Sequence, residues 1–377
     1  MRTVTVNQNK PTGQSLASSN PTSQTSLYHK LVRIRPTLKD ETKTLRVFSN
    51  SRLEAISECP TFGVVHIQRQ YPQHGRALAL EAGEAMHQFF AAMRVWQLAE
   101  KQKLPAHSKA AGTRIFGPGR YAGLRKAMAE GKSPVDQLAY AAHFILHSSG
   151  YHDDPNDKTR TLGNMETSCM EYVKETLPYL NSWPVWVADP KNPEKPIGIE
   201  QVFDVVLEYE DGGQVRFIGT LDGILCNADK NMRVTMAENK TASRLDRAWV
   251  ESFKMRHQVT GYMACGQALF NVEMWHARIY GVKIKPTYRG EDVHVEPVKR
   301  DKEAIDHWAN WVRIQADLFE KYKVSWEQAE RRTHSCNRFF RPCALIPFCA
   351  DTSQGRKEQW AQMIEAIPSP SERAILG

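Results

Sequence analysis

Two short segments, separated by a few polar residues, constrain the fold and chemistry of this chain more than any other feature. Residues 215–222 form an apolar run rich in strand formers that ends in Gly-Thr-Leu-Asp222. Residues 233–238 alternate polar and apolar side chains and continue into Glu238-Asn-Lys240. These patterns predict two β-strands, and the polar residues between them predict a turn. The resulting hairpin brings one acid from each strand to the same end of a sheet.

Carboxylates in this arrangement favour a divalent metal site. Asp222 and Glu238 offer the oxygen ligands that Mg²⁺ and Mn²⁺ prefer. Lys240 lies two residues beyond Glu238, so the alternation of a strand points both side chains to one face. A metal beside an ammonium group suits phosphodiester hydrolysis, because the metal polarises the phosphate and the lysine orients or activates water. The same residues also fit an ordinary solvated strand end, since short motifs recur by chance.

Two residues upstream of the hairpin are further candidates. His87 follows Gly83 by one turn in a strongly helical segment, where small residues allow close approach of another backbone. A single histidine on a helix is nevertheless more often an ordinary core or surface residue. Glu200 opens a predicted strand just before the hairpin. It fits a further acid near the metal and a simple cross-strand partner equally well.

Downstream, residues 246–270 contain good helix formers and no proline, which predicts one continuous helix. Gln258 and Tyr262 are four apart on it and share a face. Such a helix can pack across the sheet edge and reach the lysine or the scissile phosphate. A buried tyrosine with an ordinary surface glutamine is the alternative. Residues 302–323 predict a second, amphipathic helix whose aromatic stripe faces the core.

The chain has seven cysteines, and three of them lie close together near its C-terminal end. Cys336, Cys343 and Cys349 fall within fourteen residues, and Cys59 lies far upstream. An odd total argues against a disulfide framework, and the spacing lacks the close pairs of zinc ribbons. Four thiolates can ligate a [4Fe–4S] cluster, which would join the N-terminal helix to the C-terminal segment. The remaining three cysteines fit scattered buried thiols.

The order of these motifs resembles one nuclease family. The chain shows, in sequence, Ser-x-Leu…Cys-Pro, Gly-x3-His, Gly-x-x-Asp-Gly, Glu-x-Lys-Thr, Gln-x3-Tyr and the cysteine triplet. That order resembles the RecB-like branch of the PD-(D/E)XK nucleases, in particular members with an iron–sulfur staple. These include AddB-like and CRISPR-adaptation nucleases, and stand-alone phage nucleases look closest. Leu221 replaces the proline that names the superfamily.

The resemblance implies an α/β fold with a PD-(D/E)XK restriction-endonuclease-like core, in which helices flank a central mixed sheet and a helical insertion interrupts the domain. It also implies a role for each matching residue. These roles are metal contact by His87, Asp222, Glu238 and the backbone carbonyl of Asn239, water activation by Lys240, support beside the DNA by Gln258 and Tyr262, and cluster ligation by Cys59, Cys336, Cys343 and Cys349.

The expected domain organisation follows from composition and from the extent of the resemblance. Polar residues dominate the N-terminus, and we expect a disordered tail over 1–46. The nuclease domain is expected over 47–350, with an insertion at about 101–196 and the cysteine segment at 336–349. Residues 351–377 are expected to form a polar tail.

Charge and hydropathy limit the partners. The formal net charge of +8 suits a polyanion. Residues 109–132 are rich in basic residues and glycines, which predicts either a phosphate-contacting stretch or a solvated loop. No run approaches the eighteen apolar residues that a membrane span needs, and a cytoplasmic location is expected.

The sequence thus favours a Mg²⁺- or Mn²⁺-dependent DNA exonuclease in DNA recombination, DNA repair or phage replication. Its expected partner is single-stranded DNA or DNA ends, with a separate helicase or recombinase. Two alternatives remain. One is a cysteine-cluster accessory protein that binds DNA without cutting it, and the other is a four-cysteine zinc protein.

Overall fold

The structure is a computed structural model. It describes residues 28–69, 78–285, 292–350 and 358, apart from 326–327, 333, 335, 339–340 and 344. Residues 1–27 of the predicted N-terminal tail lie outside the described residues, as does all of the predicted tail 351–377 except residue 358.

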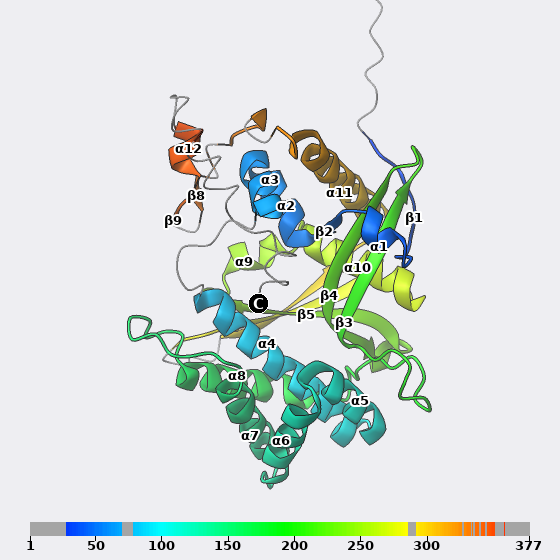
Figure 1. Cartoon of the computed structure of the whole chain (residues 1–377). Coiled ribbons are helices and arrows are strands. Elements are labelled where there is room, and N and C mark those ends of the chain that lie inside the picture. The colour runs from blue at the N-terminus through cyan, green and yellow to red at the C-terminus, as the bar shows by residue number, and fades with distance from the viewer. Residues whose placement is uncertain are drawn as a thin grey trace, which may run out of the picture.

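A mixed seven-stranded sheet forms the centre of the molecule (Figure 1). Its strands are β1 (Leu31–Pro36), β2 (Val47–Ser49), β3 (Ile199–Tyr209), β4 (Gln214–Asn227), β5 (Arg233–Ala242), β6 (His276–Lys283) and β7 (Val293–Lys299). The hydrogen-bonded order is β1-β3-β4-β5-β6-β7, and β2 pairs with β4 off this path. The β2–β4 and β5–β6 pairs are parallel, and the others along the path are antiparallel. The predicted α/β fold with a mixed central sheet is confirmed.

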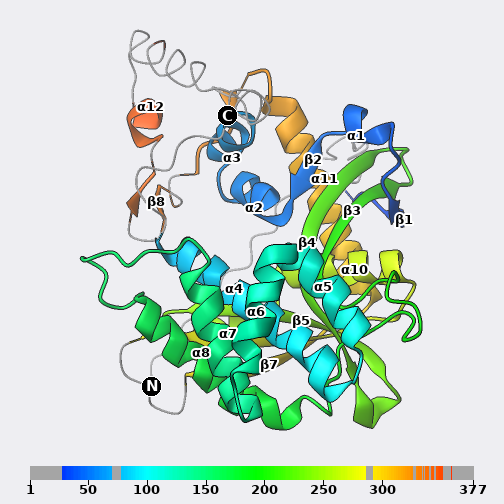
Figure 2. The ribbon, with the colours of Figure 1, turned by 60° about the horizontal axis from the view of Figure 1, so that its bottom comes forward.

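Helices cover both faces of this sheet. One set comprises α4 (Leu78–Trp96), α5 (Pro105–Phe116), α6 (Pro118–Ala129), α7 (Pro134–His147) and α8 (Leu162–Thr176). The other comprises α2 (Asn50–Glu58), α3 (Pro60–Arg69), α10 (His257–Phe270) and α11 (Lys302–Tyr322). In Figure 1 the first set lies below the sheet and α2, α3 and α11 lie above it. Figure 2 turns the first set toward the viewer, with α4 to α8 in front of the strands.

Shorter elements complete the description. They are α1 (Glu41–Thr44), the π-helical turn η1 (Gln97–Lys101), η2 (Leu177–Tyr179), η3 (Ala228–Lys230), α9 (Arg247–Ser252), β8 (Asn337–Arg338), β9 (Arg341–Pro342) and α12 (Ile346–Ala350). Within the described part of the chain, no helix combines the length and apolarity needed to cross a membrane.

The alternation of side chains along the central strands produces two hydrophobic cores. Ile224 of β4 and Met236 of β5 pack in the core formed with α2, α10 and α11. Their neighbours Leu225 and Ala237 pack in the core formed with α4 and the helices of the insertion. Successive residues of a strand point to opposite faces, so a sheet with both faces covered needs apolar residues at consecutive positions. This explains why residues 223–226 of β4 are apolar and buried at consecutive positions.

The N-terminal part of the described chain corrects one expectation. β1 pairs antiparallel with β3 as an edge strand of the sheet. The Arg35 guanidinium forms ion pairs with Glu41, at 2.5 Å, and with Glu208 of β3, at 2.7 Å. For residues 31–36 the predicted disordered tail is therefore wrong. The partners on β3 lie about a hundred and seventy residues away in the sequence, so local composition does not reveal them.

The helices correct two further expectations and confirm a third. The helix predicted over 246–270 breaks into α9 and α10. At the break, the Arg300 guanidinium donates to the Phe253 carbonyl at 2.7 Å, which satisfies a backbone group that a continuous helix would have paired. It also donates to the Thr260 side-chain oxygen Oγ1 of α10 at 2.7 Å. The basic stretch 109–132 forms α5 and α6, not a loop. The helix predicted over 302–323 is α11.

Candidate active site

The candidate site lies where the central sheet divides. The Cα of Ile218 in β4 is opposite Ser49 of β2, and the pairing of β4 with β5 begins at Gly223 opposite Ala237. Asp222 lies between these two pairings. Its Oδ2 accepts a hydrogen bond from the backbone N–H of Asn239 at 2.7 Å, which links the two strands by a side chain. The predicted hairpin is confirmed, and the two acids sit at the divergence of its strands.

Glu238 is the most enclosed acid of the site, with 1% of its surface exposed. Its Oε1 lies 2.6 Å from Lys240 Nζ and accepts a hydrogen bond from Gln258 Nε2 at 3.0 Å. Its Oε2 is buried and has no hydrogen-bond partner among the residues that the structure describes. Buried carboxylate oxygens are costly when unpaired. The second oxygen of Glu238 is therefore available to a cation.

Helix α4 carries His87 to the same point. A Cβ at Gly83 would lie 3.1 Å from Thr241 Oγ1 of β5, so glycine permits the close approach of this helix to the strand. One turn later, His87 Nδ1 lies 3.4 Å from Asp222 Oδ2. The structure thus brings His87 of α4 and Gln258 of α10 to the hairpin that carries Asp222, Glu238 and Lys240.

Burial and mutual repulsion perturb the acids of the site. Burial, followed by the charge of Asp222, raises the pKa of Glu238 to about 7, against the attraction of Lys240. Burial and the Asp222 charge likewise raise the pKa of Glu200 to about 8. Burial also opposes ionisation of Asp222, but His87 and then Lys240 outweigh it and leave the pKa of Asp222 lowered. Asp222 therefore stays ionised, and its negative charge makes ionisation of Glu238 and Glu200 less favourable.

For His87 and Lys240, the neighbouring carboxylates favour the charged form. Burial disfavours the charged form of His87, yet the Asp222 carboxylate leaves its pKa raised. Burial also disfavours the charged form of Lys240, yet Glu238 and Asp222 leave its pKa raised. Opposite charges at close range stabilise the ionised form. Lys240 therefore remains an ammonium group near neutral pH.

The donor set fits a hard divalent cation. Asp222 and Glu238 supply carboxylate oxygens, including the unpaired Oε2 of Glu238, and His87 supplies an imidazole nitrogen beside them. Mg²⁺ and Mn²⁺ prefer such oxygen-rich surroundings. Glu200 lies close enough for the charges of Asp222 and Glu238 to raise its pKa. It has φ of +45°, an uncommon conformation for a non-glycine residue that often marks functional sites.

Tyr262 supports the site from behind. Its ring packs edge-on against Phe203, with ring centroids 5.2 Å apart. A Cβ at Gly219 would lie 3.1 Å from the Tyr262 ring, so the strand before Asp222 approaches the tyrosine closely. Burial, followed by the negative charge of Glu238, raises the pKa of Tyr262. This side chain therefore stays neutral and holds β4 against α10.

Two residues of the insertion reach the site and escaped sequence reasoning. The Tyr172 hydroxyl of α8 donates to Asn239 Oδ1 at 3.2 Å. Arg114 of α5 donates to the Ile199 carbonyl at 3.0 Å, and its charge opposes the raised pKa of Glu200. Arg114 was visible only as one of several basic residues, and no motif marked Tyr172. The insertion thus contacts both β5, which carries Glu238, and the start of β3, which carries Glu200.

The four candidate cluster cysteines lie in segments that the fold brings together. Cys59 Sγ lies 4.0 Å from the Glu330 carbonyl, and the Cys343 N–H donates to the Cys336 carbonyl at 2.7 Å. Burial first, then the charges of Cys59, Cys343 and Cys336, bear on Cys349 and raise its pKa to about 11 against the effect of Arg331. All four are half-buried, and the other three cysteines are buried in the core, as predicted for scattered thiols.

These four sulfurs do not form a compact site for one ion. Among the described residues, the group whose ligand atoms lie within 4.8 Å of one another is a different one, formed by two histidines and a glutamate.

Comparison with known proteins agrees with the geometry. A family model described as the PD-(D/E)XK nuclease superfamily matches residues 47–350. None of the curated proteins matches the chain. The match covers strands β2 to β7 of the central sheet, the hairpin with its two acids and the helices on both faces. Because it spans well over half of the 377 residues, the chain belongs to the PD-(D/E)XK nuclease superfamily.

Proposed function

We propose that this protein is a Mg²⁺- or Mn²⁺-dependent deoxyribonuclease that acts as an exonuclease on single-stranded DNA or DNA ends. Membership of the superfamily implies a metal-dependent nuclease. The observation that carries the proposal is the convergence of Asp222, Glu238, Lys240 and His87 at the divergence of β4 and β5.

The residues divide the work by charge. Asp222, Glu238, His87 and the Asn239 carbonyl would hold the cation. When bound, the cation supplies Lewis-acid polarisation of the phosphate and lowers the pKa of a coordinated water. Asp222 is anchored for this role by the Asn239 N–H, and Glu238 by Gln258. Both carboxylates are therefore oriented before any metal arrives.

Lys240 acts through its positive charge. Its raised pKa keeps it protonated, so it orients the attacking water and stabilises the phosphate charge that builds up in the transition state. It does not serve as a general base in this protonated form. The adjacent Glu238, with a pKa of about 7 in the metal-free protein, is the group whose protonation competes with the cation.

The substrate preference rests on what the site can recognise. Side chains that contact phosphates position the DNA but read no sequence, and the net charge of +8 favours a polyanion. We therefore propose cleavage without sequence specificity, in DNA recombination, DNA repair or phage replication, with any helicase or recombinase supplied by a separate protein. A DNA-binding protein without activity is disfavoured because the His87, Asp222, Glu238 and Lys240 set is intact.

DNA topology separates the mode of action. End-labelled linear single-stranded and double-stranded DNA and closed circular DNA would be incubated with Mg²⁺, Mn²⁺ or EDTA. The proposal predicts metal-dependent degradation of linear DNA, with mononucleotides or short oligonucleotides as products, and intact circles. Circles cut as fast as linear DNA would show an endonuclease. Unchanged substrates with every metal, despite DNA binding, would support the non-catalytic alternative.

We further propose that Cys59, Cys336, Cys343 and Cys349 hold a structural [4Fe–4S] cluster. Two contacts support it: the Cys343 N–H donates to the Cys336 carbonyl, and the α2–α3 junction, which carries Cys59, contacts the C-terminal segment at Glu330. A cluster spreads its ligands more widely than one ion does, so compact convergence is not required. Four thiolates saturate the irons, which leaves no open position for chemistry.

Metal and sulfide analysis of anaerobically purified protein tests the cluster. We expect iron and acid-labile sulfide with a brown colour, both lost in Cys336→Ser and retained in Cys226→Ala, whose thiol is buried elsewhere. Zinc without sulfide would support the zinc alternative, and a coloured, folded Cys336→Ser protein would overturn the ligand assignment.

A further inference from the structure

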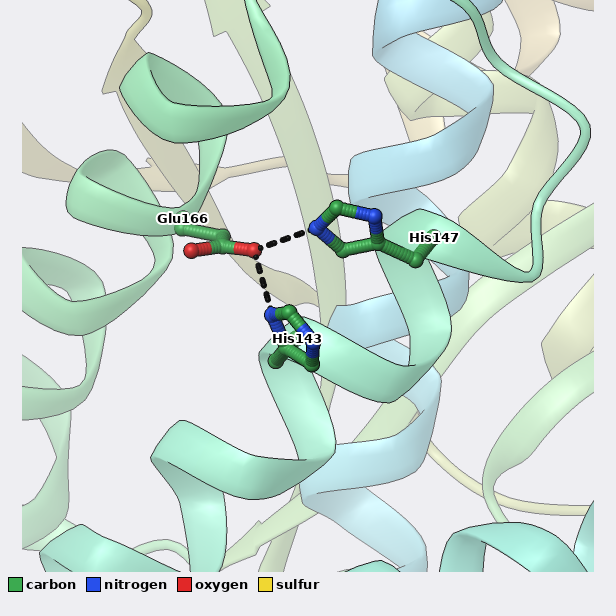
Figure 3. A group of neighbouring side chains, drawn as sticks. All are labelled: His143, His147 and Glu166. Atoms are coloured by element: carbon green, nitrogen blue, oxygen red, sulfur yellow. Dashed lines mark hydrogen bonds and ion pairs between the residues drawn. The ribbon is translucent and has the colours of Figure 1, made fainter.

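A cluster of two histidines and a glutamate lies in the helical insertion and shares no residue with the active site. His143 and His147 are on α7, and Glu166 is on α8. Figure 3 shows both imidazole rings pointing toward the one carboxylate from the same face of α7. The histidines are four residues apart, a spacing that places side chains on one helix face.

The three side chains converge on a single point. His143 Nδ1 and His147 Nε2 each lie 2.9 Å from the same oxygen of Glu166, Oε1. The ligand atoms of all three residues lie within 4.8 Å of one another. The two imidazole rings lie next to each other, with centroids 4.2 Å apart, and each turns one nitrogen toward the carboxylate.

An ordinary surface ion pair does not require this arrangement. His307 and Glu303 on α11 show the simple case, in which one histidine lies 3.5 Å from one carboxylate four residues away. In the insertion, two imidazoles share one carboxylate oxygen although both are largely exposed, at 64% and 47% of their side chains. Each ring could hydrogen-bond to water instead of to Glu166. The packing of α7 and α8 nevertheless places both rings beside the same carboxylate oxygen.

The helices that carry the cluster are fixed by their own contacts. A capping box between Ser133 and Asp136 begins α7, and the Thr161 side chain caps α8. Leu138 and Ile145 of α7 and Met165 of α8 lie in the same buried core. Ligands on packed helices are placed before binding, which lowers the ordering cost of a metal site.

We propose that His143, His147 and Glu166 bind a divalent transition-metal ion, with Zn²⁺ as the best match. Imidazole nitrogen and carboxylate oxygen are preferred zinc ligands, and three protein ligands leave a position for water. The same nitrogen-rich set disfavours Mg²⁺, so this site and the active site select different metals. The ion replaces the hydrogen bonds to Glu166 Oε1 and joins α7 to α8. Helix α8 also carries Tyr172, which contacts Asn239 in the active site.

Zinc binding to the full-length protein tests the proposal. Protein freed of loosely bound metal would be dialysed against buffered free Zn²⁺, and bound zinc would be counted per chain for the wild type, the double variant His143→Ala/His147→Ala, and Glu166→Gln. His307→Ala serves as the matched control because His307 is also an exposed histidine paired with a glutamate, and both of these residues lie on α11, outside the cluster. Counting a difference keeps zinc held by cysteines or by the active site from affecting the result.

We expect the double variant to bind one zinc ion fewer than the wild type at the same free zinc concentration. Glu166→Gln should bind that ion more weakly, because it keeps the shape but loses the anionic ligand, and His307→Ala should match the wild type. Equal zinc content and affinity in the double variant and the wild type would overturn the proposal. So would an equal loss in His307→Ala, since the zinc would then bind exposed histidines in general. Circular dichroism of each variant establishes that it is folded.

Discussion

At the scale of single residues, the burial of Glu238 defines the chemistry of the site. A carboxylate with 1% exposure needs partners, because an unpaired buried charge is strongly unfavourable. Lys240 and Gln258 both contact Oε1, and within the described part of the chain Oε2 has no hydrogen-bond partner. A divalent cation at that oxygen would complete the pairing, so we expect metal binding to stabilise the fold as well as to enable cleavage.

Replacing Gln258 tests how the carboxylate is held. Gln258→Ala removes the donor to Glu238 Oε1 but leaves every proposed metal ligand in the sequence. Loss of a partner that orients a metal ligand typically costs about 10–100-fold in metal affinity or activity, and we expect a loss in that range. Gln267→Ala, on the same helix, removes a hydrogen bond to the Met274 carbonyl and should leave Mg²⁺ dependence unchanged. Equal effects in the two variants would show that Gln258 acts through the helix alone.

The crowded carboxylates predict a pH dependence of stability without metal. The pKa values of Glu238 and Glu200 are raised from 4.5 to about 7 and about 8. Between the unfolded pKa of 4.5 and these raised values, the folded protein binds more protons than the unfolded chain. Its free energy of unfolding therefore falls as pH rises from about 5 to about 8. The raised pKa of His87 acts in the same direction, whereas the lowered pKa values of His257 and His276 act against it.

Thermal unfolding in EDTA across that pH range measures this dependence. The Tm of the wild type should decrease with pH, and the decrease should be shallower in Glu200→Gln, which removes one of the titrating groups. Added Mg²⁺ should raise the Tm most at the high-pH end. A Glu200→Gln slope identical to that of the wild type would contradict the account.

The sequence predicted the residues of the hairpin because strand alternation is local. The proximity of Asp222, Glu238 and Lys240 could be predicted from the two-residue alternation of side chains along a strand and from the single turn between the two strands. Tyr172 and Arg114 could not be predicted in the same way, because their contacts with Asn239 and with the carbonyl of Ile199 depend on how the insertion packs. Long-range packing carries no sequence period.

At the scale of elements, the approach of α4 to β5 places His87. Gly83 allows this approach, and a Cβ there would already be 3.1 Å from Thr241 Oγ1. Gly83→Leu should therefore displace the helix and separate His87 from Asp222. We expect weaker Mg²⁺ or Mn²⁺ binding, measured by titration calorimetry, in a protein that remains folded.

A glycine on another helix provides the control. A Cβ at Gly119 of α6 would have no atom of the described residues within 4 Å, so Gly119→Leu should bind metal as the wild type does. If Gly83→Leu also binds metal normally, the close approach of α4 does not govern the site.

Elements with strong local patterns were predictable and those with remote partners were not. The amphipathic pattern of α11 gave its bounds to within a residue. The break between α9 and α10 depends on Arg300, which follows it by more than forty residues. The edge strand β1 likewise depends on pairing with β3. In each case the decisive contact joins distant parts of the chain.

At the scale of the whole molecule, the site lies on a sheet covered by two cores. Adjacent residues of β4 and β5 pack into different cores, so the strands that carry Asp222 and Glu238 are fixed from both faces. Such a rigid platform suits catalysis that depends on prearranged charges. The helical insertion contacts β5 beside the site through the hydrogen bond from Tyr172 to Asn239.

The central claim is tested most directly by Lys240→Ala, with DNA cleavage and DNA binding measured on the same preparation. Lys254→Ala is the control, because Lys254 is an exposed lysine paired with Glu251. The account predicts that Lys240→Ala loses metal-dependent cleavage but binds DNA with nearly the affinity of the wild type, whereas Lys254→Ala keeps both. Cleavage by Lys240→Ala at the wild-type rate would contradict the assignment of the active site.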